Sequence, residues 1–179
     1  IDADGSCSAG TFKNCTNNGN IIITIKGGLP VKSSYGGICG VAYIDGVTFT
    51  GCKNYGNISR ISDGEDSSPY ASCVAGILGR NITIYGGSPS VDPAYLYATG
   101  DGCNTALSKC YNYGIISQHC RHSASAGPTT ANRMETSGGI VGAFVGGTID
   151  NCNNSTDASH TGTIKAGWNA ENTATCIGG

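Results

Sequence analysis

The sequence is poor in charged residues and has no extended apolar run. Only 12% of its 179 residues are Asp, Glu, Lys or Arg, and the formal net charge is -2. No apolar stretch reaches the length that a membrane-spanning helix needs. The ten Lys and Arg residues are scattered along a slightly acidic chain, unlike the clustered basic residues of a nucleic-acid-binding protein. We therefore expect neither a membrane span nor a nucleic-acid partner.

Residues that favour long helices are also sparse. Gly contributes 29 residues, and a helix interior tolerates Gly poorly. Disorder is not expected either, because the net charge is small and Ile, Val and Thr recur throughout the chain. This composition predicts short strands joined by tight turns.

Motifs for metals and catalysis are missing, although the chain has ten Cys. No Cys-x-x-Cys pair occurs, which excludes a zinc ribbon and a thioredoxin motif. The acidic stretches IDADGS and SDGEDSS do not complete a calcium loop, and we interpret SQHCRHS (117–123) as a polar loop. The acidic residues do not recur at equivalent places in adjoining repeats, as paired catalytic carboxylates would. We expect no cofactor, no metal and no enzymatic activity.

A repeat dominates the chain. The stretch TFKNCTNNGNI (11–21) returns as TFTGCKNYGNI (48–58), as LSKCYNYGII (107–116) and, with six extra residues, as TIDNCNNSTDASHTGTI (148–164). A second element, GGICG (36–40), AGILG (75–79) and GGIVG (138–142), alternates with it. Short strands and Gly or Asn turns that recur at such a period are typical of a β-solenoid.

We therefore predict one all-β domain, a parallel β-helix-like solenoid over residues 1–179. Its four degenerate repeats lie near 1–35, 36–74, 75–137 and 138–179, with a loop inserted near 80–106. Equivalent residues should stack as ladders, and β-branched side chains should fill the inward positions. The expected inward ladders are Ile21, Ile58, Ile116 and Ile164, and Ile38, Ile77 and Ile140.

Three recurring positions have a predicted role in the turns. The glycines Gly19, Gly56, Gly114 and Gly162 are expected to supply positive φ at a corner. The asparagines Asn17, Asn54, Asn112 and Asn154 can adopt a left-handed conformation, bond to neighbouring backbone, or pair along the ladder through their amides. The thiols of Cys15, Cys52, Cys110 and Cys152 are expected to point inward as small apolar groups.

The spacing of the Cys series bears on disulfides. The copies lie 37, 58 and 42 residues apart, which we interpret as about two turns of the coil each. That separation would place equivalent Cα atoms about 10 Å apart, beyond the range of a disulfide, and predicts free thiols. The remaining cysteines are better disulfide candidates, although Cys39, Cys73 and Cys176 could instead form a second inward series.

The segments GGIVGAFVGGTIDNCNN and YGGICGVAYIDGVTFTGCKNYGNI resemble the GLUG-type repeats of large secreted and surface proteins of bacteria, many of which are adhesins. The similarity covers most of the chain except the insert. What this resemblance implies is an extracellular or cell-surface β-solenoid stalk or adhesive module without a catalytic centre.

Exposed tyrosines offer a binding surface. Tyr55 and Tyr113 occupy the same turn position, and Tyr95 and Tyr97 lie in the insert. Aromatic rings can stack on sugars, and tyrosine also suits contact with a neighbouring subunit. Surface glycans and host proteins are therefore possible partners. Ice binding through Thr-x-Thr, as in TFT (48–50), is a weaker alternative because the pattern does not recur on consecutive repeats.

The ends of the sequence fit one repeat. Ile1 precedes Cys15 by the same fourteen residues that separate Ile38 from Cys52, and the glycines missing before Ile1 are Gly178 and Gly179. We expect copies to stack head to tail into an extracellular filament, with the contact formed by Ile1, Cys176, Ile177, Gly178 and Gly179. The alternative is a glycan-binding adhesin module that belongs to a longer cell-surface protein.

Overall fold

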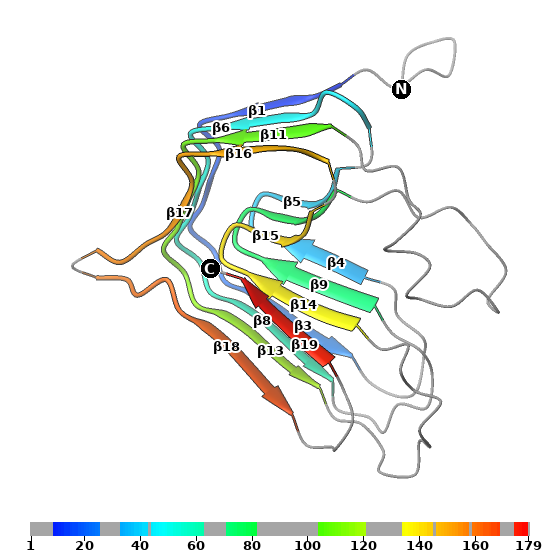
Figure 1. Cartoon of the computed structure of the whole chain (residues 1–179). Coiled ribbons are helices and arrows are strands. Elements are labelled where there is room, and N and C mark those ends of the chain that lie inside the picture. Colours follow the sequence, from blue (N-terminus) through cyan, green and yellow to red (C-terminus); the bar gives the residue numbers. More distant parts are fainter. Residues whose placement is uncertain are drawn as a thin grey trace, which may run out of the picture.

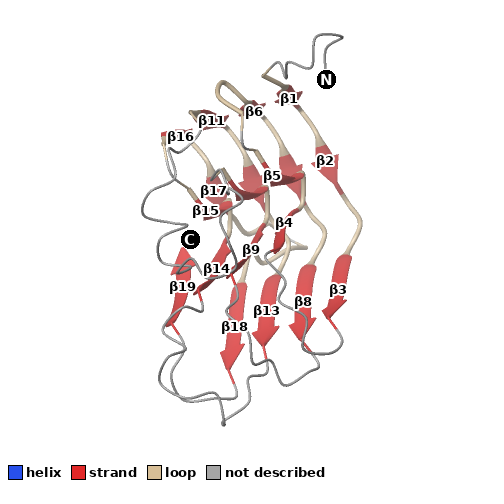
Figure 2. Ribbon diagram, turned by 90° about the vertical axis from the view of Figure 1, so that its right-hand side faces the viewer, coloured by secondary structure: helices blue, strands red, loops and turns tan. Residues whose placement is uncertain are grey.

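The computed structural model describes residues 9–25, 33–42, 44–62, 71–81, 104–120, 134–144, 146–157, 159–168 and 174–178. Its elements are all short strands, and each strand lies beside the equivalent strand of the next repeat (Figures 1 and 2). The chain therefore winds into an all-β solenoid of about four turns, which confirms the predicted fold class.

The turns contain the same succession of strands, except that the fourth has no fifth strand within the described residues. The first turn consists of β1 (Thr11–Lys13), β2 (Thr16–Asn17), β3 (Ile21–Ile25), β4 (Ser33–Gly36) and β5 (Cys39–Val41). The second consists of β6 (Thr48–Thr50), β7 (Lys53–Asn54), β8 (Ile58–Ser62), β9 (Ala71–Ala75) and β10 (Leu78–Arg80). The third consists of β11 (Thr105–Ser108), β12 (Tyr111–Asn112), β13 (Ile116–Cys120), β14 (Met134–Gly138) and β15 (Val141–Ala143). The fourth consists of β16 (Gly147–Asp150), β17 (Asn153–Asn154), β18 (Ile164–Trp168) and β19 (Ala174–Gly178).

The strands pair in five parallel sheets. Four of these sheets hold one strand from every turn, in the orders β1-β6-β11-β16, β2-β7-β12-β17, β3-β8-β13-β18 and β4-β9-β14-β19. The fifth sheet has the order β5-β10-β15. Because every pairing joins neighbouring turns, a residue stacks on its equivalent in the next copy of the repeat.

One copy of the repeat makes one turn, so the interpretation of two turns per copy was wrong. Thr48 pairs with Thr11 on one side and with Ala106 on the other, and Ala106 pairs with Thr148. The first three copies each contain five short strands. Equivalent cysteines are therefore one strand spacing apart, about 4.8 Å, rather than two.

Two apolar clusters fill the coil. The larger one lies between the β1-β6-β11-β16 sheet and the β5-β10-β15 sheet and contains Phe49, Leu78 and Leu107, all fully buried. The smaller one lies between the β3 and β4 sheets around Ile58, Val74 and Ile116. Both predicted isoleucine ladders are confirmed, since Ile21, Ile58, Ile116 and Ile164 are in register and Ile38, Ile77 and Ile140 all belong to the larger cluster.

The recurring glycines do not supply positive φ, contrary to the prediction. Positive φ occurs instead at the residue before each cysteine of the series, namely at Asn14 (55°), Gly51 (66°), Lys109 (53°) and Asn151 (52°). The asparagines of the repeat are not left-handed either. The corner that turns β1 into β2, and its equivalents, is therefore made one residue before the cysteine.

The recurring glycines are needed for a different reason, the close approach of successive turns. A Cβ on Gly56 would lie 1.9 Å from the carbonyl oxygen of Gly19, and a Cβ on Gly114 would lie 2.0 Å from that of Gly56. Real Cβ atoms do not approach backbone so closely. Only glycine fits at these two positions.

Several predicted features lie outside the described residues. They are Ile1, Gly179, Tyr95, Tyr97, Cys7, Cys103, His122 and most of the insert near 80–106. Within the described ranges, no helix is long and apolar enough to cross a membrane.

Candidate functional site: the two ends of the coil

The ends of the coil are the outer edges of the first and last turns. In the described part of the chain, β1, β2 and β3 have a sheet neighbour on one side only, and so do β16, β17 and β18. Figure 2 shows these edges on opposite sides of the molecule. The unpaired backbone groups of such an edge can pair with another parallel strand.

A ladder of asparagine amides runs through the coil from one end to the other. The Nδ2 group of Asn17 donates to Oδ1 of Asn54 at 2.7 Å, Asn54 donates to Asn112 at 2.7 Å, and Asn112 donates to Asn154 at 2.7 Å. Asn54 and Asn112 are fully buried. This confirms that the amides pair along the ladder.

The ladder has a direction. Each Nδ2 group uses one N–H for the next asparagine and the other for a glycine carbonyl of its own turn, as Asn54 does with Gly56 (2.8 Å). At the last turn Asn154 donates to Gly162, and no further asparagine follows within the described residues. At the first turn Oδ1 of Asn17 accepts only the backbone N–H of Gly19 (3.1 Å) within the same ranges. One end of the coil therefore offers an amide donor and the other an amide acceptor.

The glycine position differs at the first turn. A Cβ on Gly19 would meet only its own neighbour Asn17, at 3.7 Å, whereas the same atom on Gly56 or Gly114 would collide with the preceding turn. The space on this side of Gly19 is open because the described chain has no turn there.

The apolar interior is also open at the last turn. A cavity of about 340 Å³ is lined by Ile140, Val141, Phe144, Ile149, Cys152, Asn153 and Asn154. The side chain of Ile149 is 47% exposed. At the other end Phe12 occupies the equivalent ladder position and stacks on Phe49, with ring centroids 4.7 Å apart.

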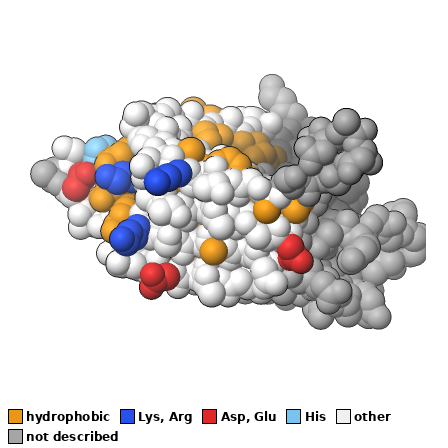
Figure 3. All heavy atoms as spheres, turned by 90° about the horizontal axis from the view of Figure 1, so that it is seen from above, with side chains coloured by type: hydrophobic (Ala, Val, Ile, Leu, Met, Phe, Trp, Pro, Cys, Tyr) orange, Lys and Arg blue, Asp and Glu red, His pale blue; other side chains and the backbone are white. Residues whose placement is uncertain are grey.

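Opposite charges occupy one ladder column at the two ends. Lys13 of β1 is in register with Thr50, Thr50 with Ser108, and Ser108 with Asp150 of β16. Charged side chains are few on the face above these strands, which is mostly uncharged (Figure 3). Lys13 and Asp150 thus lie at opposite ends of one column.

The cysteine series forms a thiol ladder beside the asparagine ladder. Cys52 and Cys110 are fully buried, and Cys15 and Cys152 pack against the same cluster from the two ends. All four thiols are free, as are those of Cys39 and Cys73. The predicted inward direction of these thiols is confirmed, but the argument against disulfides was wrong, because a separation of one strand spacing does not exclude a disulfide.

A tyrosine column lies on the outside of the β2-β7-β12-β17 sheet. Tyr55 and Tyr113 stack face to face, with centroids 4.8 Å apart and ring planes 6° apart. His160, from the extra residues of the fourth copy, tilts against Tyr55 at 5.2 Å and against Tyr113 at 6.5 Å. The two tyrosines predicted to share a position are thus brought together, and each covers one ring face of the other.

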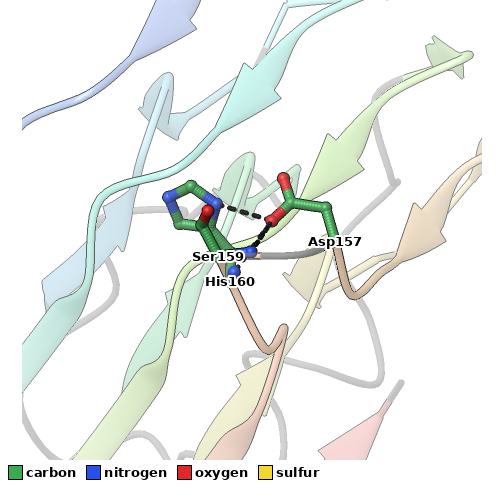
Figure 4. Close-up of polar contacts among 3 residues, drawn as sticks. All are labelled: Asp157, Ser159 and His160. Atoms are coloured by element: carbon green, nitrogen blue, oxygen red, sulfur yellow. Dashed lines mark hydrogen bonds and ion pairs between the residues drawn. The ribbon is translucent and has the colours of Figure 1, made fainter.

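A hydrogen-bonded turn fixes His160 in this place. The Oδ1 atom of Asp157 accepts the backbone N–H groups of Ser159 and His160, each at 2.8 Å, and lies 2.8 Å from His160 Nδ1 (Figure 4). The N–H of Ser159, followed by the contact with the His160 ring, lowers the pKa of the Asp157 carboxyl. The turn folds toward the second and third turns of the coil, away from the open edge of the fourth.

The predicted end-to-end contact is described only in part. Cys176, Ile177 and Gly178 form the end of β19, where Gly178 is in register with Gly138. Gly178 thus occupies the ladder position of Gly36, Ala75 and Gly138, which are the first residues of the three copies of the second repeat element.

No protein-family model, curated protein or solved structure matches this chain. The resemblance to GLUG-type repeats therefore stays a prediction, and the function rests on the geometry of the coil.

Sequence reasoning missed four end residues: Phe12, Lys13, Ile149 and Asp150. Their signal was present in the alignment of TFK, TFT, ALS and TID, in which the third column begins with Lys and ends with Asp. The sequence also shows the six extra residues of the fourth copy but not that they place His160 on the tyrosine column.

Proposed function

We propose that this chain is a non-enzymatic structural protein whose solenoid stacks end to end with further copies of itself into a filament outside the cell. The observation that carries the proposal is the direction of the asparagine ladder, with a donor at the last turn and an acceptor at the first. A polar ladder of this kind extends by head-to-tail addition and not by joining two like ends.

The register of the sheets defines the joint. If a second copy continues every ladder, its Asn17 receives an N–H from Asn154, its Phe12 covers Ile149, and its β1, β2 and β3 pair with β16, β17 and β18. The apolar cavity of the last turn is then filled by the first turn of the next copy. Parallel pairing, burial of Ile149 and completion of the amide ladder all favour the same arrangement.

Two further features support this joint. The continued ladder places Lys13 of the second copy beside Asp150, which pairs opposite charges. The turn that contains His160 leans away from the joint and leaves the edge of β16 and β17 accessible. The contact is heterologous, and it repeats without closing because the two edges lie on opposite sides of the coil and each copy continues the same axis.

Gly19→Ala tests the joint directly. We expect the variant to fold like the unmodified protein and to lose rod formation, because the added methyl group points to the side where the preceding copy would lie. Ser159→Ala, at an exposed residue of the outer turn, is the control and should form rods. Negative-stain microscopy and sedimentation velocity measure rod length, and circular dichroism measures folding. Rods of normal length from Gly19→Ala would disprove this joint.

A charge exchange tests the same joint through Lys13 and Asp150. Lys13→Asp and Asp150→Lys should each weaken association by roughly 1 kcal/mol, since each places like charges together. The double variant should recover it. An equimolar mixture of the two single variants should also assemble, as an alternating copolymer in which every joint pairs an ammonium group with a carboxylate. Sedimentation at low salt measures the association. Equal association of the two single variants, the double variant and the mixture would contradict the pairing of Lys13 with Asp150.

A repeat module of a longer cell-surface adhesin is the second candidate function. The ladder ends would serve it equally well, with further repeats of the same chain in place of a second copy. The column of Tyr55, Tyr113 and His160 favours a glycan-binding role for such a module, because aromatic side chains with polar neighbours suit sugars. Intact mass and terminal sequencing of the native protein separate the two. A chain that continues with more repeats beyond residue 179 would favour the module.

A further inference from the structure

We propose that Cys110 and Cys152 form a redox-active dithiol that reacts with low-molecular-weight disulfides, with Cys152 as the attacking thiol and Cys110 as the resolving thiol. The product is an intramolecular disulfide that joins the third and fourth turns of the coil. This inference concerns a chain whose last turn is free, because a stacked copy would fill the cavity beside Cys152.

The register of the coil places the two thiols together. Asn153 donates its backbone N–H to the carbonyl of Cys110 at 3.0 Å, which fixes the two cysteines at equivalent positions of neighbouring turns. Their Cα atoms are therefore about 4.8 Å apart, within the range that a disulfide spans. The backbone N–H of Cys110 lies 3.4 Å from Sγ of Cys152 and donates to it.

The two thiols differ in access. Cys152 lines the open cavity of the last turn, whereas Cys110 is fully buried one turn deeper. A small disulfide that enters the cavity can therefore reach Cys152 first. This difference assigns the attacking and the resolving roles.

The surroundings of the pair support the same assignment. The thiol of Cys110 has the largest effect on Cys152, and together with the backbone N–H of Cys110 it stabilises a thiolate there and lowers the pKa of Cys152 to about 7. The contact with Cys152, followed by burial, raises the pKa of Cys110. The thiolate, the reactive form of cysteine, thus forms at the accessible position.

The reaction proceeds in two balanced steps. The Cys152 thiolate attacks one sulfur of a disulfide RSSR, forms a mixed disulfide and releases RS⁻. The thiol of Cys110 then gives up its proton to the released thiolate or to water and attacks Sγ of Cys152, which releases the second RS⁻. The sum is oxidation of two protein thiols and reduction of one RSSR to two RSH.

Other cysteines of the chain provide internal controls. Cys39 is in register with Leu78, and Cys73 lies between Ser34 and Thr136, so neither faces a thiol in the next turn. Cys15 and Cys52 are stacked in the same way, but burial has the largest effect there and raises the pKa of Cys52 despite the backbone N–H of Cys15. We expect Cys39 and Cys73 to remain reduced under conditions that oxidise Cys110 and Cys152.

The test is treatment of the full reduced chain, diluted until sedimentation velocity shows single chains, with oxidised glutathione at pH 7.5, followed by alkylation and peptide mass spectrometry. The expected product contains a Cys110–Cys152 link, formed at least about tenfold faster than any adduct at Cys39 or Cys73. Cys110→Ser should stop at a stable glutathione adduct on Cys152. Cys152→Ser should leave Cys110 unmodified. Circular dichroism confirms that each variant is folded.

The unmodified chain alone can overturn the proposal. A persistent glutathione adduct on Cys152 without a link to Cys110 would show that Cys110 does not resolve it. Modification of Cys39 or Cys73 at the same rate as Cys152 would show that the ladder gives no special reactivity. Either result holds even if both serine variants fail to fold.

Discussion

Gly114→Ala is expected to lower the free energy of unfolding by at least about 3 kcal/mol, or to prevent folding altogether. The added Cβ would lie 2.0 Å from the carbonyl oxygen of Gly56 and 2.9 Å from Nδ2 of Asn54. Both partners are held in place, one as backbone and the other as part of the amide ladder. The second and third turns would have to separate, which breaks several parallel pairings at once. The midpoint of urea denaturation, followed by circular dichroism, measures this loss.

The matched control is Gly19→Ala, the same substitution at the equivalent position of the first turn. Its methyl group meets no atom closer than 3.7 Å, so the free energy of unfolding should change by no more than about 0.5 kcal/mol. The comparison separates steric conflict from the general effect of replacing glycine. Equal losses in the two variants would contradict the close approach of the turns as the reason for glycine.

The same close packing explains why the two repeated elements alternate along the chain. A Cβ on Gly76, in the second element, would lie 2.4 Å from Cγ of Asn112, and one on Gly139 would lie 2.5 Å from Cγ of Asn154. The second element of one turn thus packs directly against an amide of the ladder in the next turn. Each element therefore needs the other, and neither buries its polar groups alone.

The fold could be predicted from the sequence because its ladders are repeated in the sequence itself. Recurrence of Ile21 as Ile58 and Ile116 indicated which positions share a column, and stacking then followed from the geometry of parallel strands. The inward direction of the cysteine series followed in the same way. Such arguments need only the order of the residues within a copy.

The size of one turn could not be predicted in this way. A copy of the repeat is compatible with one long turn of five short strands or with two shorter turns, and its composition favours neither. The role of the glycines was equally ambiguous, since glycine suits both a positive φ and close contact of backbones. The deciding observation is that an added Cβ would collide with the preceding turn at Gly114 but not at Gly19. This difference can be seen only once the turns are placed in space.

The proposed joint between the two ends could be predicted from the sequence only in part. The sequence predicted that Gly178 and Ile1 belong to one repeat. It did not identify Lys13 and Asp150 as the two ends of one column, because that comparison of the first turn with the last needs the order of the turns in space. The contact of His160 with Tyr55 was also hidden, since it depends on the direction in which the extra residues fold.

Asn112→Ala is expected to lower the free energy of unfolding by about 3 to 5 kcal/mol, because it leaves buried hydrogen-bonding groups without partners. The fully buried amide of Asn112 accepts from Asn54 and donates to Asn154 (both 2.7 Å) and to the carbonyl of Gly114 (2.9 Å). Its removal leaves a buried donor on Asn54 and acceptors on Asn154 and Gly114, and each unsatisfied buried group costs about 1 to 3 kcal/mol. Urea denaturation measures the loss. Asn18→Ala, at an exposed position of the first turn, is the control.

The double variant Asn54→Ala with Asn112→Ala distinguishes a ladder from two independent asparagines. If the amides act as one hydrogen-bonded chain, the second substitution removes the donor that the first left unsatisfied. The double variant should then be more stable than the sum of the two single losses predicts, by about 1 to 2 kcal/mol. Additive losses would mean that Asn54 and Asn112 contribute separately. The amide ladder would then no longer support a direction for assembly, because a direction requires that each amide depend on its neighbour in the next turn.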